Sequence, residues 1–220
     1  MKKTCLALLA AAALPAFASL DIAAVDIEGI KLGMNEEEAA VFVQAYCETN
    51  NKEYRKEREI KVNEIEFNMH ACYDSKLDII PLTFFSLNNR VASITKFQKI
   101  ALENNKKDFI NDLLSSIQKK AIQKYSEPSL EANNLPCVFN GGESPRTFLK
   151  ILCWGECKKQ KSSSGKNVLE TKGVALIIGL NIEEETAIIV RALQDETAIS
   201  AAQKNAPKTE AEKAAAKVNL

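Results

Sequence analysis

The chain has 220 residues with 29 basic and 29 acidic side chains, so its formal net charge is zero. A dedicated nucleic-acid-binding protein carries a strongly basic face and often an aromatic stacking surface, whereas aromatic residues make up only 6% of this chain, so we expect no nucleic-acid partner. The length suits one domain of ordinary size with its own hydrophobic core.

Residues 1–18 have the three regions of a secretory signal peptide. Lys2 and Lys3 precede an apolar run over residues 6–14, and small residues around Phe17 form an A-x-A cleavage pattern that ends at Ala18. The apolar run is too short to anchor the chain in a bilayer, and no later stretch reaches that length, so we expect no membrane span. The sequence therefore predicts cleavage after Ala18 and a periplasmic or secreted protein.

Cysteine usage fits that compartment, because exported proteins commonly form disulfides. The cysteines that follow the predicted cleavage site are Cys47, Cys72, Cys137, Cys153 and Cys157. Since five is odd, one of them should be free or should pair between chains. We expect Cys47 to pair with Cys72, and Cys137 to pair with either Cys153 or Cys157, although spacing alone does not fix connectivity.

An alternative for Cys153 and Cys157 is a thiol-active pair in a C-x3-C pattern. Lys158 and Lys159 would then favour the thiolate of Cys157. Zinc normally recruits four Cys or His ligands, and His70 is the only histidine of the chain, so we expect neither a metal nor a cofactor.

In chain order, the first clear element is a helix that begins near Asn35. Gly33 permits a tight turn after a short strand, Asn35 can cap the helix, and Glu38 completes a capping-box pattern. Acidic residues at 36–38 lie in the first turn, where the helix dipole favours negative charge. The apolar stripe that should face a sheet contains Ala39, Val43, Tyr46 and Cys47.

The charged run 50–59 is typical of a solvated connection. Residues 60–73 then alternate between apolar and polar side chains, which predicts a half-buried strand with His70 on its polar face. Two further strands, over 79–87 and 90–97, should be joined by Asn88-Asn89, because asparagine tolerates the left-handed conformations of a tight hairpin.

The second half begins with a strongly periodic helix over 105–125. The composition of 130–146 predicts a loop, and strands are expected over 147–155, 168–180 and 186–194, with a mobile basic loop near 158–166. From Asp195 the chain is rich in Ala, Lys and Glu, which predicts a tail over 195–220 that is disordered or weakly helical.

Both halves thus follow a pattern of one helix and three strands, over about 26–98 and 105–194. The simplest fold for this pattern is a single α+β domain over residues 19–194, in which an antiparallel sheet carries two helices packed on one face.

The run Gly29 to Ala39, G-I-K-L-G-M-N-E-E-E-A, resembles the helix start of small exported Gram-negative proteins of uncharacterised function. It is also similar to the start of the small lipoprotein of the barrel-assembly machinery and of β-lactamase-inhibitor-like domains. Lys124 to Pro128 is similar to the K-Y-G-x-P ending of the second helix in the uncharacterised group. The chain lacks the lipidation cysteine of the lipoprotein. The resemblance implies an α+β fold and a non-enzymatic protein.

We therefore expect a protein that binds another envelope protein rather than an enzyme. The expected contact surface consists of Trp154, Tyr73, Lys158, Lys159 and Lys161. Two alternatives stay open: thiol activity at Cys153 and Cys157, and binding of a small apolar ligand between the sheet and the helices.

Overall fold

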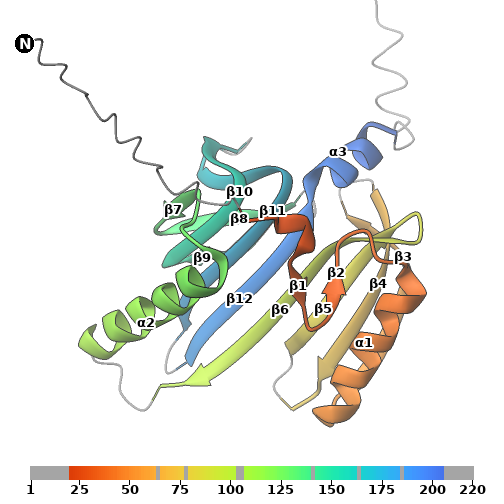
Figure 1. Cartoon of the computed structure of the whole chain (residues 1–220), viewed down its shortest axis with the longest axis horizontal. Helices are drawn as coiled ribbons and strands as arrows, with labels where there is room; N and C mark the ends of the chain where they lie inside the picture. Colours follow the sequence, from red (N-terminus) through yellow and green to blue (C-terminus); the bar gives the residue numbers. More distant parts are fainter. Residues whose placement is uncertain are drawn as a thin grey trace, which may run out of the picture.

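The structure is a computed structural model that describes residues 20–62, 65–76, 79–102, 107–139, 142–162, 165–183 and 186–205. These residues form one large sheet with helices on its faces (Figure 1). The predicted signal peptide and residues 206–220 lie outside the described residues.

The first half is a helix followed by an antiparallel meander. Its elements are α1 (Glu36–Thr49), β3 (Glu53–Val62), β4 (Ile65–Asp74), β5 (Ile79–Leu87) and β6 (Arg90–Ala101). Asn88 and Asn89 have φ values of 50° and 60° and form the two-residue turn between β5 and β6. This confirms the predicted hairpin, because a turn of this kind needs positive φ at both central positions.

The second half adds more strands than the sequence predicted, and it joins the first half through β12, which pairs antiparallel with β6. Its elements are α2 (Lys107–Tyr125), β7 (Leu130–Ala132), β8 (Leu135–Phe139), β9 (Gly142–Phe148), β10 (Lys150–Lys161), β11 (Asn167–Glu183), β12 (Thr186–Asp195) and α3 (Glu196–Asn205). The ten-stranded sheet has the main order β3-β4-β5-β6-β12-β11-β10-β7, with β8 paired to β11 and β9 paired to β8.

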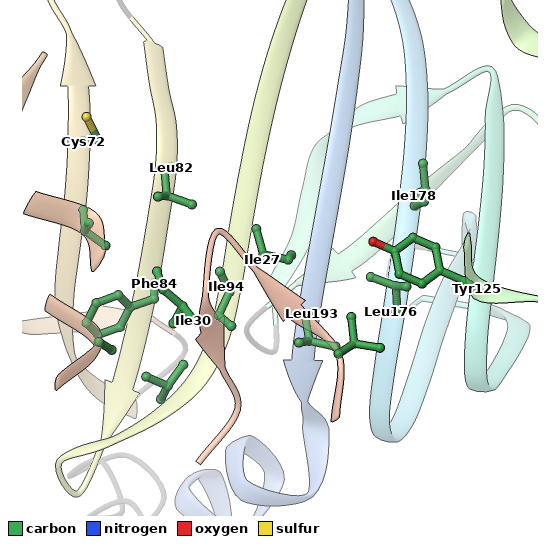
Figure 2. Packing of buried hydrophobic residues seen from close by; sticks show 14 of the residues in the cluster. Ile27, Ile30, Cys72, Leu82, Phe84, Ile94, Tyr125, Leu176, Ile178 and Leu193 are labelled. Carbon is green, nitrogen blue, oxygen red and sulfur yellow. The ribbon is translucent and has the colours of Figure 1, made fainter. Parts of the chain in front are cut away.

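A short N-terminal segment crosses the middle of the sheet. It contains the 3-10 turn η1 (Ile22–Ala24) and the two-stranded hairpin β1 (Asp26–Ile27) and β2 (Ile30–Lys31). Ile27 and Ile30 are 1% and 0% exposed, and Figure 2 shows both beside Ile94 of β6. The hairpin is therefore fixed to the sheet by two core residues.

Two different sets of elements cover the two faces of the sheet. On one face, α1, the N-terminal hairpin and the C-terminal end of α2 share a core that includes Ala121 and Tyr125. On the other face, Ile199 of α3 packs with Ile65 and Phe67, while the β8–β9 hairpin covers a separate core. No helix of the described segments is long and apolar enough to cross a membrane.

The expected fold of two helix-plus-three-strand units is wrong. The described chain is mostly β, with four strands after α1, six after α2, a parallel contact between β8 and β11, and a third helix. The run 50–59 forms most of β3, which is charged because it lies at the edge of the sheet and faces solvent. Most of the segment 130–146, expected to be a loop, belongs to the short strands β7, β8 and β9.

The C-terminal expectation also needs correction. Residues Glu196–Asn205 form α3, and Ile199 is fully buried, so this part of the expected tail belongs to the fold. Ile199 and the partly buried Ala202 of this Ala-rich run pack against the sheet and attach the helix to it.

Candidate functional site

The β10–β11 hairpin bends sharply at Gly155 of β10 and Gly173 of β11, which both have positive φ. Gly155 lies opposite Ala175, but the next residue, Glu156, lies opposite Lys172, so β11 contains two extra residues at this point. Gly155 has a φ of 109°, and a Cβ atom at this position would lie 2.5 Å from the carbonyl oxygen of Val174. Only glycine fits this conformation and this close approach.

A disulfide spans the bend. Cys153 and Cys157 are bonded and their Cα atoms are 6.4 Å apart, whereas residues four apart in a straight strand would be separated by about 13 Å. The Ser129 hydroxyl lies 2.6 Å from the carbonyl oxygen of Gly155 and adds a hydrogen bond across the same bend. The bend thus brings the two cysteines together, and the disulfide and Ser129 hold it.

Beyond the bend lies a segment that we call the basic hairpin, Glu156–Lys172. It contains two glutamates and five lysines, which gives it a net charge of about +3 in a chain whose net charge is zero. Its lysines, all exposed, are Lys158, Lys159, Lys161, Lys166 and Lys172. Lys158 pairs with Glu170 at 3.0 Å, so most of the positive charge remains available to a partner.

The two aromatic residues expected at the contact surface do not join these lysines. Trp154 is only 2% exposed, and its Nε1 donates to the carbonyl oxygen of Ser126 at 3.0 Å, so the expectation that it is an exposed contact residue is wrong. Tyr73 is half-buried on β4, which is four strands from β11 and five strands from β10 in the sheet. The Arg55 guanidinium lies 4.0 Å from the centroid of the Tyr73 ring. The lysines form a surface without either aromatic residue.

The cysteine pairing differs in part from expectation. Cys47 of α1 is bonded to Cys72 of β4, the pairing favoured from the sequence, whereas the expected bond from Cys137 to Cys153 or Cys157 is wrong. Cys137 is a buried free thiol in the same apolar cluster as the other two. Burial raises the pKa of the Cys137 thiol to about 12, so it remains protonated.

The same environment disfavours exchange at the neighbouring disulfide. Cys157 is partly exposed, but Cys153 is fully buried in the apolar cluster. A thiolate that attacked Cys157 would release Cys153 as a thiolate in apolar surroundings, and exchange slows when the leaving thiol has a raised pKa. The geometry therefore favours a structural clamp over a thiol-active pair.

A second cluster, missed by the sequence reasoning, lies beneath the first turn of α1. Glu36 is 4% exposed, and its carboxylate accepts from Ser86 at 2.5 Å, Asn68 at 2.9 Å, His70 Nε2 at 2.9 Å and Lys56 at 3.0 Å. Burial alone would raise the pKa of Glu36, but these four donors together hold it well below its ordinary value of 4.5. Glu36 is thus an ionised carboxylate that joins α1 to β3, β4 and β5.

The arrangement around His70 superficially resembles a catalytic relay. His70 Nδ1 lies 2.6 Å from the Tyr54 hydroxyl, while its Nε2 contacts Glu36. However, His70 is 1% exposed and stacks on Phe84, and burial raises rather than lowers the pKa of Tyr54. A sealed base beside a weakly acidic hydroxyl suits a structural role better than nucleophilic catalysis.

Neither a metal site nor an apolar ligand cavity stands out in the described part of the chain. No group of three or more His, Cys, Asp or Glu side chains is placed there to hold a metal ion. A hollow of about 320 Å³ between the N-terminal segment and α2 is mainly apolar, but it is open to solvent, and charged residues share its lining. It is lined by Leu20, Ala24, Val25 and Tyr125 together with Asp21, Asp26 and Lys124.

No protein-family model matches this chain, and neither a curated protein nor a solved structure matches it. The resemblance to small exported Gram-negative proteins therefore stays a prediction.

Proposed function

We propose that the chain is an exported protein of the cell envelope that acts by binding a protein with an acidic surface, and that the basic hairpin is the contact element. The predicted signal peptide motivates the compartment, and two disulfides are compatible with an oxidising environment. The proposed activity is non-enzymatic.

The observation that carries this proposal is the bend at Gly155, held by the Cys153–Cys157 disulfide. A contact element that is already ordered loses less conformational entropy on binding than a flexible loop of the same composition. The exposed lysines on it can then steer an acidic partner and set the orientation of the complex.

The composition of the hairpin favours a protein over a nucleic acid or a membrane. Its exposed positions carry no aromatic side chain for base stacking and no large apolar anchor for lipid. The described residues at its end are Ser162, Gly165, Lys166 and Asn167. These hydrophilic groups match a surface of carboxylates.

The test is in-cell cross-linking of the full chain with a C-terminal tag, followed by mass spectrometry. The variant Lys158→Glu/Lys159→Glu/Lys161→Glu reverses charge on the hairpin. The matched control makes the same change at exposed lysines elsewhere, Lys99→Glu/Lys119→Glu/Lys120→Glu. Vesicles of anionic lipid provide a parallel binding assay for both variants.

We expect one dominant acidic protein that is captured by the unmodified chain and by the control, and whose capture falls at least about tenfold in the hairpin variant. Equal capture by both variants would overturn the proposal. So would charge-dependent binding to vesicles without a protein partner, or recovery of thiol-oxidation enzymes alone as mixed disulfides.

A further inference from the structure

Two cations face each other at the centre of the sheet. Lys96 of β6 and Arg191 of β12 are register partners across the antiparallel pair. Their side chains are 17% and 27% exposed, so both charges are partly removed from water. Like charges directly opposite each other destabilise a sheet, and partial burial increases that cost. The pair therefore requires an anion.

In this structure the anion is a carboxylate of the chain itself. Glu28 lies at the tip of the β1–β2 hairpin, and its Oε1 accepts hydrogen bonds from Lys96 and, at 3.3 Å, from Arg191. Glu28 has a φ of 55°, a left-handed conformation that few non-glycine residues adopt. A two-residue hairpin turn requires this conformation, and the turn between Ile27 and Ile30 places the Glu28 carboxylate on the two cations.

The cluster has more donors than one carboxylate can satisfy. Two cations and one anion leave a formal charge of +1 among these three side chains. Tyr46 of α1 lies beside them, with Lys96 Nζ 5.2 Å from its ring centroid. Burial and the charge of Glu28 raise the pKa of Tyr46, while Arg191 acts in the opposite sense, so Tyr46 stays neutral and its ring adds no charge to the cluster.

The backbone of the hairpin and the side chain of Glu28 differ in how firmly they are held. Ile27 and Ile30, on either side of the tip, are anchored in the core (Figure 2), whereas the Glu28 side chain is 31% exposed. The side chain can rotate into solvent without movement of the hairpin. Figure 1 shows the tip of the hairpin over β6, between α1 and β12.

From this geometry we infer that Lys96 and Arg191, beside the ring of Tyr46, form a binding site for a small oxyanion, a carboxylate or a phosphate, and that Glu28 occupies this site as an internal competitor in the free protein. The ligand replaces the Glu28 carboxylate on the same donors, so no covalent step is involved. This site is separate from the basic hairpin, and its failure would leave the proposed function standing.

The experiment is a titration of the full chain with inorganic phosphate and, separately, with acetate, monitored by the backbone amide resonances of Lys96 and Arg191. Sodium chloride at matched ionic strength corrects for screening. The variant Glu28→Gln removes the competitor while keeping the side-chain size. Glu131→Gln is the matched control, because Glu131 is also a partly exposed carboxylate that pairs with a lysine, Lys150.

We expect saturable binding of the anion. If Glu28 leaves the site free in roughly one molecule in ten, Glu28→Gln should bind the anion about tenfold more tightly than the unmodified chain. Tighter binding of phosphate than of acetate would identify a phosphoryl ligand, and tighter binding of acetate would identify a carboxylate. Adding Arg191→Met to Glu28→Gln should abolish the effect. The inference is overturned if Glu28→Gln binds neither anion, or binds no tighter than Glu131→Gln.

Discussion

Replacement of Glu36 by glutamine tests whether the buried carboxylate under α1 holds the helix on the sheet. The change preserves side-chain size but removes the charge that four donors share. A hydrogen bond to a charged group contributes about 1.5 to 3 kcal/mol, and loss of one partner of a buried ion pair costs about 3 to 5 kcal/mol. We expect Glu36→Gln to lower the free energy of unfolding by about 3 kcal/mol at pH 7.

The matched control is Glu38→Gln in the same helix turn. Glu38 is exposed, so its replacement removes only the favourable interaction with the helix dipole, which is worth about 0.3 to 1 kcal/mol. Urea denaturation followed by circular dichroism, with the disulfides intact, measures both variants. If the two variants lose the same stability within about 0.5 kcal/mol, Glu36 has no special role.

The same residue predicts a pH dependence. The pKa of Glu36 is lower in the folded protein than its ordinary value of 4.5, so its ionised form stabilises the fold. This contribution is fully present above pH 4.5 and is lost as the pH falls from 4.5 towards the folded-state pKa. Acid should therefore destabilise the unmodified protein more than Glu36→Gln, and parallel pH profiles would refute the depressed pKa.

Two further predictions concern the covalent and backbone geometry. Replacing Cys47 and Cys72 by alanine should lower the free energy of unfolding by about 3.5 kcal/mol, and replacing Cys153 and Cys157 should lower it by about 2 kcal/mol. The first bond joins residues 25 apart and the second joins residues 4 apart, so the first closes the longer loop. Equal losses in urea denaturation would contradict this order. Gly155→Ala should lower the free energy of unfolding by at least about 2 kcal/mol more than Gly165→Ala. Both glycines have positive φ, but only a Cβ at Gly155 collides with the backbone. Equal melting temperatures of the two variants would refute the collision.

Local signals in the sequence were sufficient for the β5–β6 hairpin and for the start of α1. Asn88 and Asn89 determine a tight turn by their own conformational preferences, and the side chain of Asn35 does cap α1, accepting from the backbone N–H of Glu37 at 2.9 Å. Features of this kind depend on neighbours within a few residues, so a single sequence contains the information that they require.

The edge strand β3 shows where local signals fail. Its residues are mostly charged, which is typical of a loop. Tyr54, opposite Cys72, packs against the core on the α1 side, whereas Ile60 lies opposite Phe67 of the other face, beyond a β-bulge between Glu57 and Ile60. An edge strand needs only half of one face to be apolar, and charge on its other groups protects it from pairing with further strands. The bulge also breaks the period-2 alternation between Tyr54 and Ile60, so the sequence pattern did not mark the strand.

Long-range pairing explains why the polar clusters were missed. Glu36 was assigned to the helix dipole because its donors lie 20 to 50 residues away, on three different strands. Nothing near Glu36 in the sequence indicates that His70 and Ser86 will lie beneath it. A buried carboxylate can be predicted only once the sheet register is known, because its stability depends on donors that the register brings together.

The segment that precedes and begins α1 supplies two carboxylates to the same face of the sheet, and their exposure separates their roles. The Glu36 side chain is 5% exposed and accepts from four donors, whereas Glu28 is 31% exposed and accepts from two cations. Removal of Glu36 from its donors would leave buried polar groups without partners, so exchange with a ligand is strongly opposed there. Glu28 can rotate into water and leave Lys96 and Arg191 to another anion. One carboxylate therefore fixes the fold, and the other is in the position where a ligand can compete.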